Sequence, residues 1–506
     1  MVTTEKVQNK AFVSIIWGFV NKFGTQILAI VPAMVLARLV TPRDYGLIAM
    51  AGIFSGLVSI FVDSGFGMAV IQKKNLSHVD TCSVFYFNIV ISSIVYAILY
   101  IAAPYVADFF NMSEICAILR VSSISIVIGA FGSIHGHLFS KNLDFKHPTI
   151  RNLSAQVIAA LVAIAIALGG FGYWALVFQS MVSTLFSTLI NWFYSPWRPT
   201  LVFSLESLRS MFGFGSSMLG KSISDFGFAK VYDLVIGKFY SAADLSYFNR
   251  AYATVSLFLD TFLGVINNIA FPVFSKMQDD KVRMRTNVLR FLYIESMIMF
   301  FIMLLAASLS APLFHFLYSS KWNAVIPLFQ ILCLWGLLKP ISVILANGLM
   351  ASGKSKVCLR NSFIGRGLNV LFLVVTWRFG LEMMIVGQIV AFFLEVLLYM
   401  QAFNKEFKYG LVDLVKDLWP YLLIAVLVSG SVYVFDRYLM ASWTYLLISE
   451  IVESVFRLSI GVLLGIFLFV IVNRMLKLKA YCDFRKIVID ATQNKEKVNN
   501  WVVKIL

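Results

Sequence analysis

The stretch LARLVTPRDYG, residues 36–46, decides the fold because a related turn returns 200 residues further along the chain. At that offset Arg38 falls on Lys238, Thr41 on Ser241 and Asp44 on Asp244, and Asn21 falls on Lys221. In both copies we expect a helix to end, a short turn to carry the aspartate, and a long apolar helix to follow. An interval of this length holds an even number of predicted spans, so both copies have one orientation. The pattern predicts a parallel repeat about an axis along the membrane normal, with a central site between two halves.

The composition of the whole chain indicates a polytopic membrane protein. Hydrophobic residues make up 59% of the 506 residues and charged residues 13%, whereas soluble proteins have about 45–50% and about 25%. Such a chain has too little charge to cover a soluble surface and too much apolar surface to remain disordered. Five cysteines in a chain of this length exclude a disulfide scaffold.

The hydropathy pattern predicts fourteen membrane spans, each close to the ~20 apolar residues that cross a bilayer. They run approximately over residues 12–39, 45–71, 81–106, 116–140, 148–168, 173–194, 208–236, 246–271, 291–309, 324–350, 357–376, 383–402, 419–435 and 451–472. We therefore predict an all-α fold with two six-helix lobes around a central cavity. The N-lobe would occupy residues 1–200 and the C-lobe residues 201–403, followed by two extra helices in 404–473 and a basic cytoplasmic tail in 474–506.

The distribution of basic residues sets the predicted orientation. With the N-terminus in the cytoplasm, the cytoplasmic segments and tail hold 28 lysines and arginines and the outer segments hold 6. This is the positive-inside bias, and it explains most of the +16 net charge without a nucleic-acid surface. We expect both termini in the cytoplasm of a bacterium and the chain in its inner membrane. The first span carries Lys22 and lacks a cleavage site, so we expect it to be retained.

Several activities are excluded by what the loops and motifs lack. No outer loop exceeds about twenty residues, which leaves no room for an extramembrane active site. The sequence has no phosphate-binding loop, no dinucleotide-binding glycine pattern and no GxSxG motif. His135 and His137 are too few for a metal site. We therefore expect neither an enzyme nor a metal or organic cofactor.

Polar residues inside the predicted spans are candidates for a wet cavity, because ionisable groups at membrane depth cost at least ~2.5–3.5 kcal/mol each. In span one, Lys22 shares a face with Thr25 and Gln26, and in span two Ser55 and Ser59 lead to Asp63. The further in-span charges on which the predictions rest are Arg120, Lys221, Asp225, Lys230, Asp233, Arg250 and Asp260.

Each of these polar features has a structural alternative. Lys221 with Asp225, and Lys230 with Asp233, lie four and three residues apart and could neutralise each other within one helix. Arg366 and Arg457 could extend to the membrane interface. Pro32 in span one could allow a gating bend or only a static kink.

Five motifs stand out along the chain: LARLVTPRDYG at 36–46, DSGFGMAVIQKK at 63–74, YFNRA at 247–251, FPVFSKMQ at 271–278 and NGLMASGKSK at 347–356. They resemble the polysaccharide-repeat exporters (Wzx-like flippases) of the multidrug/oligosaccharidyl-lipid/polysaccharide superfamily. The resemblance covers roughly residues 10–400 and is closest to the colanic-acid and teichuronic-acid exporter branch.

The resemblance implies transport of an undecaprenyl-pyrophosphate-linked oligosaccharide from the inner to the outer leaflet, with a polysaccharide polymerase and co-polymerase as possible partners of a monomer. It also implies basic residues that bind the pyrophosphate. The positions expected to do so are Lys22, Arg120, Lys221 and Arg250. Candidates for coupling to H+ or Na+ are Asp63, Asp225 and Asp260, and Pro32 is the candidate gating position.

Four other functions stay open at this point. A lipid II flippase is hardly separable by sequence. A cation-coupled multidrug antiporter would favour carboxylates without nearby bases, and Lys22 and Arg120 argue against it. A glycan polymerase or ligase lacks its outer loop, and a scaffold would not need in-span charges. The basic tail after Val472 is expected to lie on the cytoplasmic membrane surface.

Overall fold

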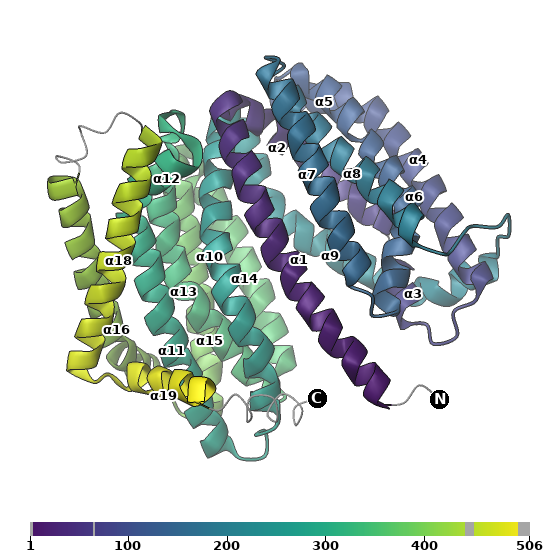
Figure 1. The fold of residues 1–506 in the computed structure, drawn as a ribbon. Coiled ribbons are helices and arrows are strands. Elements are labelled where there is room, and N and C mark those ends of the chain that lie inside the picture. The colour runs from purple at the N-terminus through teal and green to yellow at the C-terminus, as the bar shows by residue number, and fades with distance from the viewer. Residues whose placement is uncertain (1–3, 64–65, 441–449, 494–506) are drawn as a thin grey trace. The chain divides into compact units, whose positions relative to one another are not determined.

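The computed structural model describes residues 4–63, 66–440 and 450–493. In these ranges all regular secondary structure is helical (Figure 1). The chain divides into two compact units, Met1–Ser246 and Tyr247–Leu506. Each unit is described by itself below.

The first unit contains the first nine helices and the beginning of the tenth. They are α1 (Thr4–Leu39), α2 (Pro42–Asp63), α3 (Phe66–Gln72), α4 (His78–Phe110), α5 (Glu114–Ser122), α6 (Ile124–Lys141), α7 (Lys146–Leu168), α8 (Trp174–Tyr194) and α9 (Leu205–Phe239). Helix α7 packs on both α1 and α8, and α9 packs against α2. The small side chains of Ala163 on α7 and Ala175 on α8 are fully buried beside Leu36 of α1, which lets these helices pack closely.

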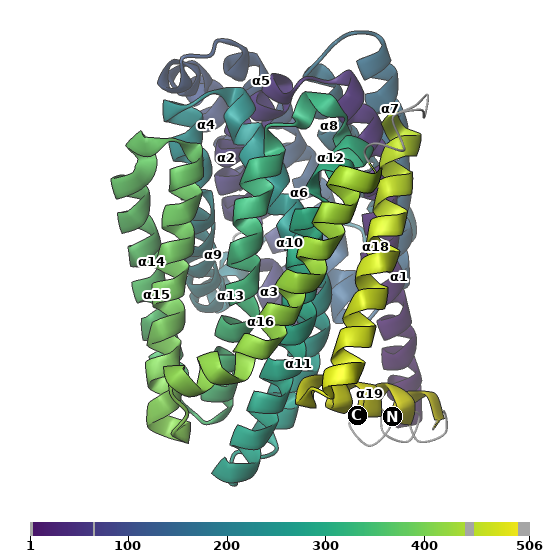
Figure 2. The same ribbon diagram turned by 90° about the vertical axis from the view of Figure 1, so that its left-hand side faces the viewer.

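The second unit contains most of α10 and the rest of the chain. Its helices are α10 (Ala242–Ser275), α11 (Lys281–Ser308), α12 (Ser310–Tyr318), η1 (Ser320–Trp322), α13 (Val325–Ala351), α14 (Ser355–Thr376), η2 (Trp377–Phe379), α15 (Leu381–Phe407), α16 (Leu411–Val434), η3 (Phe435–Met440), α18 (Glu450–Leu476) and α19 (Lys479–Gln493). Helix α11 packs against α13 and α16, and α14 packs along α15 (Figure 2). Helix α19 runs across the ends of the bundle helices.

Eleven helices of the described chain are long and apolar enough to cross a membrane. They coincide with eleven of the predicted spans, which confirms a multi-pass membrane protein. The three remaining predicted spans correspond to α2, α9 and α10, which have 22, 35 and 34 residues. At 1.5 Å per residue each is at least about 33 Å long, enough for a bilayer core. Helices α9 and α10 carry most of the predicted in-span charges, which lowers their mean hydropathy.

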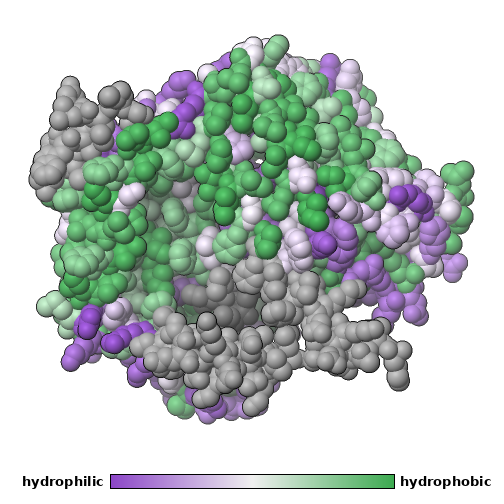
Figure 3. Space-filling view, viewed as in Figure 1, coloured by the Kyte–Doolittle hydropathy of each residue, from purple (hydrophilic) through white to green (hydrophobic). Residues whose placement is uncertain are grey.

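The outer flanks of the helices carry the apolar surface that contact with lipid requires. Leu161 is 65% exposed and Phe193 81% exposed in the first unit, and Leu463 is 67% exposed in the second. Hydrophobic residues dominate the helix flanks seen in Figure 3. In water such a surface would be unfavourable, so its extent indicates a lipid environment.

The described part of the second predicted span, residues 45–71, comprises two helices. Helix α2 is described up to Asp63 and the short helix α3 from Phe66, and residues 64–65 lie outside the described residues. Phe66 and Val70 of α3 are buried against Phe85 and Ile134. This packing places α3 against α6, so the apolar run that sequence reading assigned to one span covers two helices.

The predicted spans were also too short at several ends, and α4 shows why. Ser77 accepts a hydrogen bond from the N–H of Asp80 over 3.1 Å, and Asp80 accepts one from the N–H of Ser77 over 2.9 Å. This capping box starts α4 three residues before the predicted span at 81. The helix continues to Asn111, whose left-handed conformation ends it.

Candidate functional site: charged side chains within the helices

The two repeated turns have the same hydrogen-bonded structure. The hydroxyl of Thr41 donates to Oδ2 of Asp44 over 2.7 Å, and the N–H of Asp44 donates back to Thr41 Oγ1 over 3.2 Å. Ser241 and Asp244 make the same pair of bonds over 2.7 and 3.0 Å. Each turn is therefore an N-cap that fixes where α2 or α10 begins, and hence the level of the polar residues along these helices.

The first turn lies directly against the beginning of α10, inside the first unit. A Cβ atom on Gly46 would overlap the carbonyl group of Ala242 and would lie only 2.8 Å from its Cα. The position equivalent to Gly46 in the second copy is Ser246, whose hydroxyl donates to the carbonyl of Ala243 over 2.8 Å. Glycine is therefore needed in one copy only, where another backbone approaches.

Lys22 is exposed on α1, and its neighbours hold that helix to α7. The amide of Asn152 donates to Oδ1 of Asn21 over 3.2 Å, and the amide of Gln156 donates to the carbonyl of Thr25 over 3.1 Å. The Thr25 hydroxyl donates to the carbonyl of Asn21 over 2.6 Å, so it is engaged by its own helix. Lys22 has no carboxylate within ion-pair distance among the described side chains.

Helix α9 carries one paired lysine and one exposed lysine. Nζ of Lys230 lies 2.6 Å from Oδ2 of Asp233, which is buried. The alternative of self-pairing within one helix is therefore confirmed for this pair. Lys221 is exposed, and no carboxylate of the described side chains lies within ion-pair distance of it. Asp225 is half-buried on the same helix.

The two arginines predicted to bind pyrophosphate rest on aromatic rings. Cζ of Arg120 lies 4.3 Å from the ring centroid of Tyr100, and its Nε donates to the Tyr100 carbonyl over 3.3 Å. Cζ of Arg250 lies 5.2 Å from the ring of Tyr318 and 5.6 Å from that of Trp322. Cation–π contacts of this kind hold a guanidinium in place. The guanidinium groups of Arg120 and Arg250 are therefore held by aromatic rings, whereas the amines of Lys22 and Lys221 are exposed. All four residues remain predicted ligands of the pyrophosphate.

A charged cluster that sequence reading did not assemble lies in the second unit. Nζ of Lys339 on α13 lies 5.3 Å from the ring of Trp335 and 5.1 Å from the ring of Phe392. The carboxylates of Glu395 and Asp260 lie close enough for their charges to act on Lys339. Asp260, a predicted coupling residue, thus lies in the neighbourhood of a lysine of its own unit.

One further charge completes the cluster around Lys339. Arg366 on α14 lies close enough for its charge to act on Glu395 of α15. A Cβ atom on Gly365 would lie 2.5 Å from the carboxyl carbon of Glu395, so the glycine makes room for this side chain between the two helices. The signal available in the sequence was the presence of these four charges within four different predicted spans.

Arg457 on α18 is paired with two acids. Its guanidinium donates to both carboxylate oxygens of Asp436 over 2.8 and 2.7 Å, and to Glu453 over 2.9 Å. Asp436 lies just beyond the predicted end of its span at residue 435, where the chain continues as the π-helix η3, so this ion pair was not predicted.

The other predicted positions have less specific surroundings. Pro32 is half-buried inside α1, which is one continuous helix from Thr4 to Leu39. Asp63 lies outside the residues whose side chains the structure describes. The hydroxyls of Ser55 and Ser59 donate to carbonyls of their own helix, those of Ala51 and Gly56, over 3.2 and 2.7 Å.

Among the described residues, the in-span cations fall into two groups. Lys22 and Lys221 present amines without a carboxylate, while most other cations are held by rings or acids. Among the described residues no three potential metal ligands of the His, Cys, Asp and Glu types meet.

Comparison with known proteins identifies the family of this chain. Residues 35–327, more than half of the sequence, match the family described as "Polysaccharide biosynthesis protein". The chain belongs to this family. The family's description and the names of the relatives below refer to polysaccharide biosynthesis. The resemblance seen in the sequence motifs is thereby confirmed.

Two curated relatives support this assignment to the polysaccharide biosynthesis family. Lipopolysaccharide biosynthesis protein WzxC of Escherichia coli (strain K12) is 24% identical over 435 residues, which cover 84% of this chain and 83% of the relative. Teichuronic acid biosynthesis protein TuaB of Bacillus subtilis (strain 168) is 24% identical over 340 residues, 66% of this chain and 70% of the relative.

The fold of this polysaccharide biosynthesis family member is also known from solved structures. The inward closed conformation of the lipid II flippase MurJ matches with a TM-score of 0.71 and 15% identity, covering 91% of this chain and 99% of that one. At this identity the similarity establishes the fold alone.

Proposed function

We propose that this chain moves an undecaprenyl-pyrophosphate-linked oligosaccharide repeat unit across the bacterial cytoplasmic membrane by alternating access. The product would serve the biosynthesis of a surface polysaccharide, which could be an exopolysaccharide, a capsule or an O-antigen. The polar head of such a lipid cannot cross hydrocarbon unaided, whereas its polyprenyl tail need not leave it. A transporter for it requires a wet, cationic path inside the membrane.

The observation that carries this proposal is the pair of exposed amines on long helices, Lys22 of α1 and Lys221 of α9. A cation at membrane depth is stable only where water, a partner charge or a ligand reaches it. Neither amine has a carboxylate at ion-pair distance among the described side chains. A pyrophosphate would supply the missing negative charge through charge-assisted hydrogen bonds.

The membrane arrangement proposed for this function has fourteen spans, with α2, α9 and α10 added to the eleven apolar helices. Two six-helix lobes would flank the path, and both termini would be cytoplasmic. The equal hydrogen bonding of the turns at Thr41 and Ser241 supports the repeat between the lobes. The charge bias supports the orientation.

Transport in one direction also needs a driving force. Asp63, Asp225 and Asp260 remain the proposed sites for coupling to H+ or Na+, and Pro32 the proposed gating position. Removal of the product by a polysaccharide polymerase and co-polymerase at the outer surface would also drive export. The unit of transport would be a monomer.

Substitution of Lys22 tests the proposal in a strain that lacks the chromosomal copy of this gene. Lys22→Ala should reduce surface polysaccharide at least tenfold and cause the lipid-linked repeat unit to accumulate, because the anion loses a charge-assisted contact that contributes about 1.5–3 kcal/mol. Lys22→Arg should retain part of the activity because it keeps the charge. Lys74→Ala, an exposed base outside the spans, is the matched control.

The amount of each variant in the membrane is measured by immunoblotting, so that loss of export is separated from loss of protein. Normal export by Lys22→Ala at wild-type abundance would show that this lysine is not a ligand. Equal loss in Lys22→Ala and Lys22→Arg would indicate that packing against α7, rather than charge, is the requirement.

A further inference from the structure

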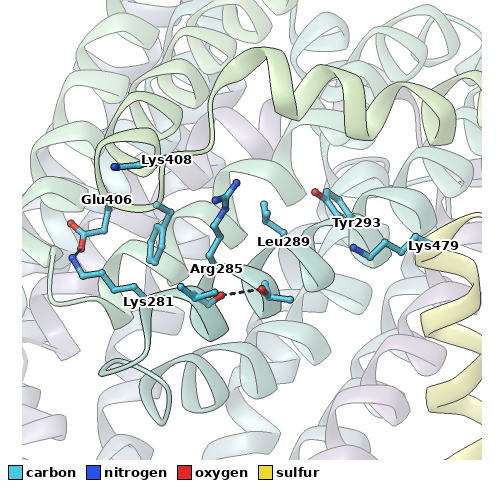
Figure 4. A pocket seen from close by; sticks show the side chains of 10 residues that line it. Lys281, Arg285, Leu289, Tyr293, Glu406, Lys408 and Lys479 are labelled. Atoms are coloured by element: carbon cyan, nitrogen blue, oxygen red, sulfur yellow. Dashed lines mark hydrogen bonds and ion pairs between the residues drawn. The ribbon is translucent and has the colours of Figure 1, made fainter.

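A basic pocket of about 460 Å³ lies in the second unit, at the ends of several helices (Figure 4). Arg285 of α11, Lys408 at the end of α15 and Lys479 at the beginning of α19 line it. These three cations come from three separate elements of the chain. A pocket of this volume can take a small headgroup or ligand.

The acidic residues around this pocket are already engaged by other groups. Glu406 lies 2.7 Å from Nζ of Lys281 and 3.5 Å from Nζ of Lys354. Asp417 accepts hydrogen bonds from the hydroxyls of Tyr293 and Tyr409. The carboxylates of Glu406 and Asp417 therefore have partners other than the three cations that line the pocket.

The three cations themselves have no carboxylate within ion-pair distance among the described side chains. Cζ of Arg285 lies 5.8 Å from the ring centroid of Tyr409, and Nζ of Lys479 lies 6.0 Å from that of Tyr293. Such contacts orient the cations but leave their N–H donors available. Lys408 is exposed. The pocket thus holds three uncompensated positive charges.

The position of the pocket places these charges where helices leave the membrane. Helix α11 begins at Lys281 and α15 ends at Phe407. Helix α19 crosses the helix ends there (Figure 2). It is fixed by a hydrogen bond of 3.2 Å from the N–H of Ala480 to the Tyr421 hydroxyl. Arg290 and Asp483 add an ion pair at 3.3 Å between α11 and α19.

We propose that this pocket binds the phosphate headgroup of an anionic phospholipid from the leaflet on that side, which the charge bias predicts to be cytoplasmic. Bases near an anionic leaflet attract its headgroups, and a phosphate diester can accept hydrogen bonds from Arg285, Lys408 and Lys479 together. Binding would also hold α19 against the end of α11. This inference does not depend on the transported substrate.

Lipid binding by the purified full-length chain in detergent tests the proposal. The probe is dioctanoyl phosphatidylglycerol, and dioctanoyl phosphatidylcholine is its neutral counterpart. Wild-type protein should bind the first at least about tenfold more tightly than the second. The triple variant Arg285→Gln, Lys408→Gln, Lys479→Gln should lose that preference.

Matched controls separate a site from general surface charge and from misfolding. A second triple variant, Lys74→Gln, Arg209→Gln and Lys276→Gln, removes three exposed bases elsewhere and should keep the preference. The single variant Arg285→Gln should weaken phosphatidylglycerol binding severalfold if the triple variant does not fold. Inorganic phosphate at millimolar concentration should not compete with the lipid.

Three results would overturn the proposal. Equal affinity of the wild type for the two lipids would exclude headgroup recognition. Equal loss of preference in the two triple variants would assign binding to overall charge. Full competition by inorganic phosphate would make the pocket a site for a soluble anion, not for a lipid.

Discussion

The helix pairs α1–α2 and α9–α10 begin their second helices in the same way but carry their charges differently. Both turns close with a hydroxyl and an aspartate in reciprocal hydrogen bonds. Yet α1 has the exposed Lys22 beside an amide seam with α7, whereas α9 has the exposed Lys221 and the Lys230–Asp233 ion pair. The turns therefore fix where α2 and α10 begin in both copies. The two copies differ instead in the charges that α1 and α9 carry.

The largest effect should come from Gly46, which occurs in one copy only. Gly46→Ala would press a methyl group into the backbone carbonyl of Ala242, which cannot move as a flexible side chain can. We expect a loss of about 3 kcal/mol or more in stability, measured as a lower thermal unfolding midpoint in detergent. Gly52→Ala on the same helix is the control, since its added methyl group meets nothing within 4 Å. Equal behaviour of both variants would refute the close contact.

A smaller effect should separate the two lysines of α9. Lys230→Ala leaves the buried carboxylate of Asp233 without its partner, which should cost about 2 kcal/mol. Lys221→Ala should leave stability unchanged, because that amine has no carboxylate partner among the described side chains. Both are measured by thermal unfolding. Adding Asp233→Asn to Lys230→Ala should restore part of the loss, and a lack of rescue would argue against the ion pair as its cause.

The smallest effects should be equal in the two copies. Thr41→Ala and Ser241→Ala each remove an N-cap hydroxyl and should each lower stability by about 1 kcal/mol. The hydroxyl of Thr261 donates to a carbonyl of its own exposed helix segment, so Thr261→Ala should change stability little. A large difference between the two cap variants in unfolding midpoint would mean that the turns are alike in sequence but not in energetic role.

Hydropathy and charge were sufficient to predict the class of this protein, because a span must be apolar over its whole length. The repeated turn was also predictable, because the hydroxyl and the aspartate that close it are only three residues apart in the sequence. The packing of α3 was not predictable from the apolar run. It depends on burial of Phe66 and Val70 against distant helices.

The candidate site was predictable only as a set of residues, not as an arrangement. Which cations are exposed depends on partners from other helices, as Tyr100 holds Arg120 and Asp436 holds Arg457. The Lys339 cluster likewise joins residues from α10, α13, α14 and α15. Spacing along the sequence predicted an ion pair correctly where both residues lie on one helix, as Lys230 and Asp233 do.

The most direct test of the account is transport by the purified chain in liposomes that contain an undecaprenyl-pyrophosphate-linked oligosaccharide. A glycan-degrading enzyme added outside measures how fast the inner-leaflet pool becomes accessible. We predict that wild-type protein exposes this pool, and that Lys22→Ala and protein-free liposomes leave it protected. Protection in all three samples, together with movement of lipid II or a cationic dye by the wild type, would contradict the account.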